Sequence, residues 1–267
     1  MLRRRKFGTV VLMYHRLGRG VLAGRASAEE AYAVLPESFE RQLDILQQTR
    51  CEVVPLAEAG SSPAGPRVAL TFDDGNASDR LHAAPRLVAR GLSATFFVTP
   101  AFVGGPDYLS WEQARELAEL GMEIGSHGWD HSPLGRLPLE QVRAQLADSK
   151  NEIEARLGRP CLSISLPNGS GGARELALAR ELGYRIVAGS VPRRLLAASR
   201  GEPLPRFALR SADPLPWFRA VVEQRPLALA RVYFRYAVLQ AARNAVGEDA
   251  YARVRNRWAG ARADRAA

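Results

Sequence analysis

Short apolar runs alternate with amphipathic segments along most of the chain. The runs are rich in β-branched and aromatic residues and short enough to be buried strands. They lie at 9–14, 51–56, 67–72, 93–100, 122–127, 162–167 and 184–189. The intervening segments with helical spacing of apolar positions lie at 39–48, 78–91, 111–120, 138–158 and 173–183. Ser38 offers an N-cap for the first of these helices, and Pro85 limits the regularity of the second.

This rhythm of strand, helix and strand predicts parallel βαβ units. The simplest arrangement is an α/β fold, a distorted (β/α) barrel of about seven parallel strands. Residues 217–267 break the rhythm, and we expect them to form a basic helical extension after a catalytic barrel at 1–216. In such barrels the chemistry gathers on loops at the carboxyl ends of the strands. Polar residues fall at those ends, namely His15, Asp73, Asp74, Ser126, His127 and 167–169.

The charge of the chain is concentrated at its two ends. The 267 residues carry a formal net charge of +9. Residues 1–6 hold four basic groups and no acid, and 217–267 hold ten arginines against four acids, so the stretch between them is nearly neutral. Nucleic acid is therefore not an expected partner. A hydrophobic content of 46% supplies a full core, and two cysteines, Cys51 and Cys161, cannot form a disulfide framework.

The sequences of the two ends also indicate where in the cell the protein is expected. The apolar run that follows the basic start covers only 7–13, which is short for a secretory signal. The stretch 227–246 is long enough to span a bilayer, but its three arginines would each cost about 2.5–3.5 kcal/mol near the bilayer centre. We expect a cytoplasmic protein, with export through a partner left open. The basic ends suggest peripheral contact with an anionic inner membrane, although most such helices simply pack on their domain.

Two adjacent carboxylates, Asp73 and Asp74, follow the apolar strand at 67–72. One can bind a cation while its neighbour accepts a proton, because adjacent side chains at a strand end point to different sides. Burying both without a cation would force one pKa upward through like-charge repulsion. The alternative is a solvated turn, because Asp-Asp-Gly is also favourable turn chemistry.

Two of the chain's four histidines, His127 and His131, lie four residues apart. Histidines at this spacing can converge on one metal ion as neutral imidazole ligands. The alternative is a pair of ordinary polar loop residues. One carboxylate with two histidines is a suitable facial set for a divalent transition metal, and it leaves positions open for water and substrate.

Together these two segments resemble the polysaccharide deacetylase family, the NodB-homology group of carbohydrate esterases. Thr-Phe-Asp-Asp-Gly at 71–75 matches the first motif of that family, and 127–131 matches its His-x-x-x-His second motif. The resemblance covers about residues 8–210. It implies a metal-dependent hydrolase, with Zn²⁺ as the expected ion, that removes N-acetyl groups from N-acetylated polysaccharides or oligosaccharides. By this match Asp73 is the general base, and the metal ligands are Asp74, His127 and His131.

The third motif departs from the family pattern. Where many members have an arginine that pairs with the base, this chain has Ser165, in Ser-Leu-Pro-Asn-Gly at 165–169. The turn is kept, so the backbone N–H of Asn168 is the expected donor to the oxyanion, against the alternative of an ordinary turn. Ser165 leaves open which group pairs with Asp73 and controls it as a base. It also leaves room for a family member that binds carbohydrate without catalysing a reaction.

No histidine follows His131, so the late histidine that protonates the leaving amine in many members is absent. This resembles the branch that deacetylates poly-N-acetylglucosamine exopolysaccharides, in which an N-terminal histidine is the acid. The resemblance makes His15 the expected general acid, against the alternative of a structural histidine that caps its strand. It also suggests a role in bacterial exopolysaccharide biosynthesis, with a lipid-linked sugar or another amide as the alternative substrate.

Three further residues are candidates for contact with the base or the sugar. Arg206 could orient the base or a substrate hydroxyl from a late strand, or it could lie on the surface. Trp111 and Trp129 could stack on sugar rings, and Trp129, between the two histidines, is the better placed. For both tryptophans the alternative is a role in the core.

Overall fold

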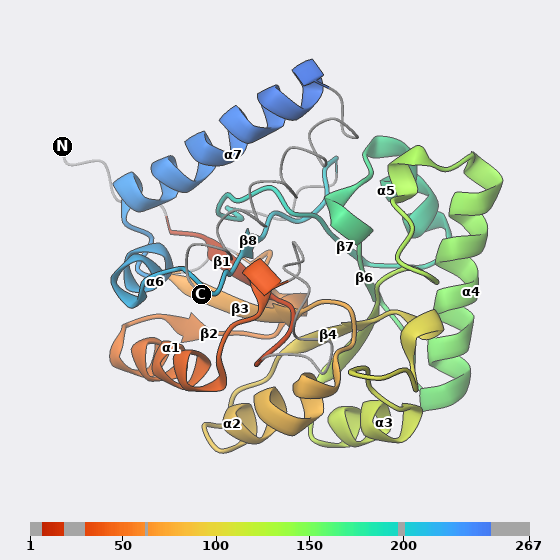
Figure 1. Ribbon diagram of the computed structural model, residues 1–267, viewed down its shortest axis with the longest axis horizontal. Coiled ribbons are helices and arrows are strands. Elements are labelled where there is room, and N and C mark those ends of the chain that lie inside the picture. Colours follow the sequence, from red (N-terminus) through yellow and green to blue (C-terminus); the bar gives the residue numbers. More distant parts are fainter. Residues whose placement is uncertain (1–6, 19–29, 62–63, 197–200, 247–267) are drawn as a thin grey trace, which may run out of the picture.

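The computed structural model describes residues 7–18, 30–61, 64–196 and 201–246, and its strands form one parallel sheet (Figure 1). Seven strands follow one another in the order β7-β6-β5-β4-β3-β1-β8. Their bounds are β1 Thr9–Tyr14, β3 Arg67–Phe72, β4 Thr95–Val98, β5 Glu123–Ser126, β6 Ser163–Ser165, β7 Ile186–Ala188 and β8 Phe207–Ala208. A short β2, Glu52–Val53, pairs with the start of β3 outside this path.

The two ends of the sheet meet, so the strand path closes into a distorted barrel. Leu204, between β7 and β8, makes a parallel bridge to Ala188. The last strand, β8, then pairs with β1. The predicted barrel of about seven parallel strands is confirmed. The run at 51–56 contributes only the two residues of β2, because Pro55 and the 3₁₀ turn Leu56–Glu58 end it.

Helices connect the strands on the outside of the barrel. They are α1 Pro36–Gln48, α2 Ala84–Val88, α3 Trp111–Glu119, α4 Leu139–Leu157 and α5 Ala173–Glu181. The predicted cap at Ser38 is wrong, since Leu35 holds the cap position and Pro36 begins the helix, where a missing N–H costs nothing. The predicted helix at 78–91 is divided, because a π-helical turn, Asp79–Ala83, precedes α2.

Successive side chains of each strand face two separate apolar clusters. Leu12 and Tyr14 of β1 face outward and join the large cluster beneath the helices. Val11, which directly precedes Leu12, faces inward and belongs to a smaller cluster with Ala69 and Phe97. Toward the carboxyl ends of the strands the inward positions become polar, and those positions form the site described below.

Two helices, α6 Leu215–Val222 and α7 Pro226–Val246, follow the barrel. The boundary predicted at residue 216 falls inside α6, whose Phe218 and Val221 are buried in the main core. The blue helix α7 runs along one edge of the domain (Figure 1). Residues 247–267 of the predicted extension lie outside the described part of the chain. Among the described helices, none combines the length and the apolar character that crossing a membrane requires.

Candidate active site

Asp73 and Asp74 approach the same histidine from the carboxyl end of β3. His127 Nε2 lies 3.9 Å from Asp73 Oδ2 and 3.4 Å from Asp74 Oδ1. Simple alternation along the strand would send the two carboxylates to opposite sides. The backbone instead turns at Asp74, which has a left-handed φ of 78°, and at Gly75, with a φ of 73°. A left-handed aspartate stores roughly 1–3 kcal/mol of strain, and such strain clusters at functional sites.

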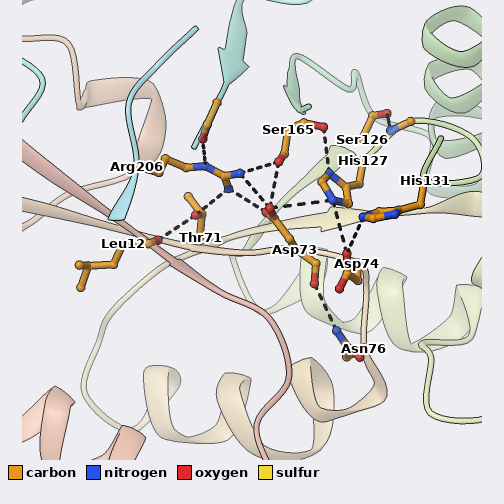
Figure 2. A network of polar contacts seen from close by, with 12 residues as sticks. Leu12, Thr71, Asp73, Asp74, Asn76, Ser126, His127, His131, Ser165 and Arg206 are labelled. Atoms are coloured by element: carbon orange, nitrogen blue, oxygen red, sulfur yellow. Dashed lines mark hydrogen bonds and ion pairs between the residues drawn. The ribbon is translucent and has the colours of Figure 1, made fainter. Parts of the chain in front are cut away.

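The three predicted metal ligands converge on one point (Figure 2). Asp74 Oδ1 is 3.4 Å from His127 Nε2 and 3.5 Å from His131 Nε2. The candidate ligand atoms of all three residues lie within 4.8 Å of one another. His127 is buried directly after β5, and His131 is half-buried with a left-handed φ of 66°. The structure therefore brings together the carboxylate and both imidazoles that the sequence singled out.

The donor atoms of this set fit a divalent ion. Asp74 Oδ1 is buried and has no hydrogen-bond partner among the described residues, which is costly unless a cation or water satisfies it. His127 Nδ1 lies 2.9 Å from the carbonyl oxygen of Ser165. The nitrogen facing that carbonyl must be the N–H, so the lone pair of the neutral ring is on Nε2, toward Asp74. One carboxylate oxygen and two imidazole nitrogens suit zinc and related ions.

Arg206 holds Asp73 with a two-point contact inside the barrel (Figure 2). Its Nη1 donates to Asp73 Oδ1 at 2.7 Å and its Nη2 donates to Oδ2 at 2.8 Å. The other N–H groups donate to Thr71 Oγ1, Ser165 Oγ and Gly189 O. All five guanidinium donors therefore have acceptors. A bidentate pair of this kind fixes both the position and the orientation of the carboxylate.

Ser165 takes part in the control of Asp73. Its Oγ donates to Asp73 Oδ2 at 3.0 Å and accepts from Arg206 Nη2 at 2.7 Å. The arginine that the third motif lacks at Ser165 is therefore replaced by Arg206, which pairs with Asp73 from another part of the chain. The alternative of a surface role for Arg206 is wrong, because this residue is only 1% exposed. Arg206 follows Leu-Pro in the sequence and lies in none of the three motifs, so no local pattern indicated its pairing with Asp73.

Opposing charges set the protonation of the site. Burial raises the pKa of Asp73, but the charge of Arg206 and then of His127 holds that pKa well below its usual range. Burial lowers the pKa of His127, yet the charges of Asp73 and Asp74 leave it raised. The pKa of His131 is lowered by burial and by the neighbouring His127. Asp73 is therefore anionic at neutral pH, and a metal must compete with a proton mainly at His127.

The other two predicted catalytic residues lie at the same end of the barrel. His15 directly follows β1, the neighbour of β3, and lies close enough for a positive charge on its ring to lower the pKa of both Asp73 and Asp74. His15 Nδ1 is buried with no hydrogen-bond partner among the described residues, so this nitrogen caps no described backbone group. Asn168 lies exposed in the turn after β6, with a left-handed φ of 55°. The roles assigned to His15 and Asn168 stay predictions.

The two candidate tryptophans have different surroundings. Trp111 packs against the main core, and the guanidinium carbon of Arg156 lies 5.7 Å from the centroid of its ring. Trp129 is 37% exposed and lies between the two histidines in the chain. Trp129 is therefore open to a ligand, whereas Trp111 belongs to the edge of the core.

Asp79 is a buried acid that the sequence did not single out. It lies in the π-helical turn after the first motif, fully buried, and neither carboxylate oxygen has a partner within the described ranges. Burial, then the charges of Asp74 and Asp73, raise its pKa well above the usual range. The sequence placed Asp79 at the start of an amphipathic helix, where an acid is unremarkable, so nothing indicated its burial.

The fold and the site together define a parallel barrel with a candidate metal centre at the carboxyl ends of its strands. Comparison with known families adds that residues 60–187 match the polysaccharide deacetylase family. The matched stretch contains both of the motifs that carried the resemblance, at 71–75 and 127–131.

Three relatives illustrate how far this likeness extends. The Bacillus subtilis protein YxkH is 29% identical over 198 residues, which cover 72% of this chain and 67% of YxkH. The peptidoglycan-N-acetylglucosamine deacetylase PgdA of Listeria monocytogenes is 30% identical over 140 residues, 52% of this chain but only 28% of PgdA. The solved structure of IcaB from Ammonifex degensii is 28% identical, with a TM-score of 0.66, over 82% of this chain and 98% of IcaB.

Proposed function

We propose that this protein is a divalent-metal-dependent hydrolase that removes N-acetyl groups from an N-acetylated saccharide. The observation that carries the proposal is one polar network in which Asp74, His127 and His131 adjoin the buried, ionised Asp73. The domain family and the name of the Listeria relative support N-deacetylation as the reaction. An N-terminal histidine near the base, with no histidine after His131, supports the exopolysaccharide branch as the source of the substrate.

Different residues of the chain carry out the separate steps of amide hydrolysis. When bound, a divalent ion supplies polarisation of the acetyl carbonyl and a lowered pKa for water. Asp73 accepts the proton of the attacking water, and Arg206 keeps this base ionised and correctly oriented. The backbone N–H of Asn168 donates to the oxyanion as it forms. His15, directly after the strand that neighbours β3, protonates the departing amine.

The buried arginine also argues against a catalytically silent member. A silent carbohydrate-binding protein has no need to keep a buried carboxylate ionised beside a metal set. Here all five donors of Arg206 are used, and two of them go to Asp73. A buried ion pair often stabilises a fold less than hydrophobic residues of similar volume would. The presence of this pair therefore favours a catalytic role for Asp73 as a general base.

Acetate release from N-acetylglucosamine oligomers tests the proposal. We expect the zinc-loaded protein to release acetate and the chelator-treated protein to lose most of this activity. Asp73→Asn keeps the shape of the site without the base, and we expect it to lower the rate by about 10²–10⁴-fold. Asp148→Asn, at an exposed position on α4, is the matched control and leaves the rate unchanged. Equal release from the wild type and from Asp73→Asn would contradict the proposed mechanism.

A further inference from the structure

Helix α7 is apolar on two opposite faces, and only one of them packs on the domain. Leu229 and Val232 pack against the main core. On the other side Leu227, Phe234 and Val238 are 73%, 70% and 50% exposed. Spacings of seven and four residues place these three on one side of a helix. We call them the open face. An exposed apolar stripe of this kind marks an interaction surface.

Positive charge borders the open face. Arg231 and Arg235 each lie within about one helical turn of Phe234. Neither forms an ion pair among the described residues, although the charge of Arg235 acts on Asp213. The segment 226–246 contains three arginines and no Asp or Glu. Between α6 and α7 a groove lined by Trp217, Leu227 and Arg231 continues the same mixture of apolar and basic groups. The partner must therefore offer both apolar contact and negative charge.

An anionic bilayer surface offers both. A helix with an apolar face bordered by basic residues lies in the interfacial plane, with its apolar side chains among the acyl chains and its basic groups at the lipid phosphates. Phe234 supplies an aromatic ring on this face, as such helices commonly do. A second copy of the chain fits less well, because pairing two open faces would bring the arginines of both copies together. A nucleic acid would leave Leu227 and Phe234 without apolar contact.

We propose that α7 docks this protein on an anionic membrane surface through Leu227, Phe234 and Val238, with Arg231 and Arg235 at the headgroup phosphates. The docking is peripheral, since no described helix can span the membrane. It places the barrel beside the bilayer without taking part in the chemistry of the site. The inference is independent of the proposed function, because it uses none of the site residues.

Co-sedimentation of the full chain with lipid vesicles tests the docking. We expect the wild type to sediment with phosphatidylcholine vesicles that contain phosphatidylglycerol, and to remain in the supernatant with phosphatidylcholine alone. The double variant Leu227→Ser/Phe234→Ser removes apolar contact and weakens binding by about tenfold or more. Arg231→Gln/Arg235→Gln weakens it by about fivefold for each charge removed. All four positions are exposed, so the fold should tolerate these changes, and the thermal midpoint checks this.

Two controls on α4 match these changes outside the open face. Leu139→Ser removes a leucine that is 49% exposed, and Arg143→Gln removes an exposed arginine. Both should bind the anionic vesicles like the wild type. The proposal is overturned if the wild type shows no preference for phosphatidylglycerol, or if Leu227→Ser/Phe234→Ser binds as well as Leu139→Ser. It is also overturned if light scattering shows a dimer that the Phe234 change alone dissociates, because a second copy then covers the face.

Discussion

Arg206 and Asp73 form a buried two-point ion pair across the barrel, with N···O distances of 2.7 and 2.8 Å. The two residues are 133 positions apart in the chain. Asp73 ends the inward-facing row of β3, and Arg206 precedes β8, the strand that closes the barrel against β1. Closing the barrel therefore also delivers the partner of the candidate base, so the fold and the site depend on the same strand.

Replacing Arg206 should change both stability and the pH dependence of activity. Arg206→Ala leaves a buried carboxylate without its partner, which we expect to cost about 3–5 kcal/mol of unfolding free energy. Because Arg206 holds the pKa of Asp73 below its usual range, its loss raises that pKa and moves the acid limb of kcat/KM to higher pH.

The variant Arg206→Lys separates the effect of Arg206→Ala on stability from its effect on the pH dependence of activity. It keeps a positive charge, and it should restore part of the stability and most of the position of the acid limb. Denaturant unfolding and the pH profile of kcat/KM measure the two quantities. If Arg206→Ala leaves the acid limb at the same pH as in the wild type, Arg206 has only a structural role.

The role of His15 can be tested by changing the leaving group. His15→Ala should lower the rate on N-acetyl sugars by about 10²–10⁴-fold, because an amine must be protonated to leave. An activated aryl acetate ester has a leaving group that needs no proton, so its hydrolysis should be much less affected. Measuring kcat for both substrates gives the contrast. Equal losses on amide and ester would contradict a role as general acid.

Asp79 should destabilise the metal-free protein at neutral pH. Its folded pKa is raised above the unfolded value by burial and by Asp74 and Asp73. The sign follows from proton linkage: the folded state is penalised where Asp79 must ionise, and the penalty disappears below about pH 3.9, the unfolded value. Asp79→Asn should therefore raise the thermal midpoint at pH 7 by roughly 2–4 °C for each kcal/mol relieved.

The gain from Asp79→Asn should shrink as the pH falls toward 4. Asp148→Asn, an exposed position, serves as the control and should show no such trend. Thermal melts in the presence of a chelator, at several pH values, provide the measurement. A midpoint lowered at pH 7 would show that the ionised Asp79 stabilises the folded protein through a partner such as ordered water.

The parts of the fold that the sequence predicted are those with strong local patterns. The strand at 9–14 and the helix at 138–158 are long enough for periodicity to identify them, and both are present as β1 and α4. The short β8, with two residues, has no period to detect. The cap at Ser38 was wrong because proline at the first turn of α1 competes with it as a start signal.

The candidate site likewise contains residues that local motifs predicted and residues whose contacts depend on the tertiary fold. Asp74, His127 and His131 lie in compact motifs, so a short stretch of sequence carries their relationship. The pairing of Arg206 with Asp73 depends on how the barrel closes, which no local pattern encodes. The burial of Asp79 depends on a π-helical turn that an amphipathic helix pattern cannot distinguish from a regular start.

The central claim is that Asp74, His127 and His131 hold a metal while Asp73 acts as the base. Zinc content and acetate release, measured on the same purified samples, test this division. We expect one zinc per chain in the wild type, in Asp73→Asn and in the control His82→Ala, and little in His127→Ala. Only the wild type and His82→Ala should release acetate from N-acetylglucosamine oligomers. Zinc retained by His127→Ala, or full acetate release by Asp73→Asn, would contradict the account.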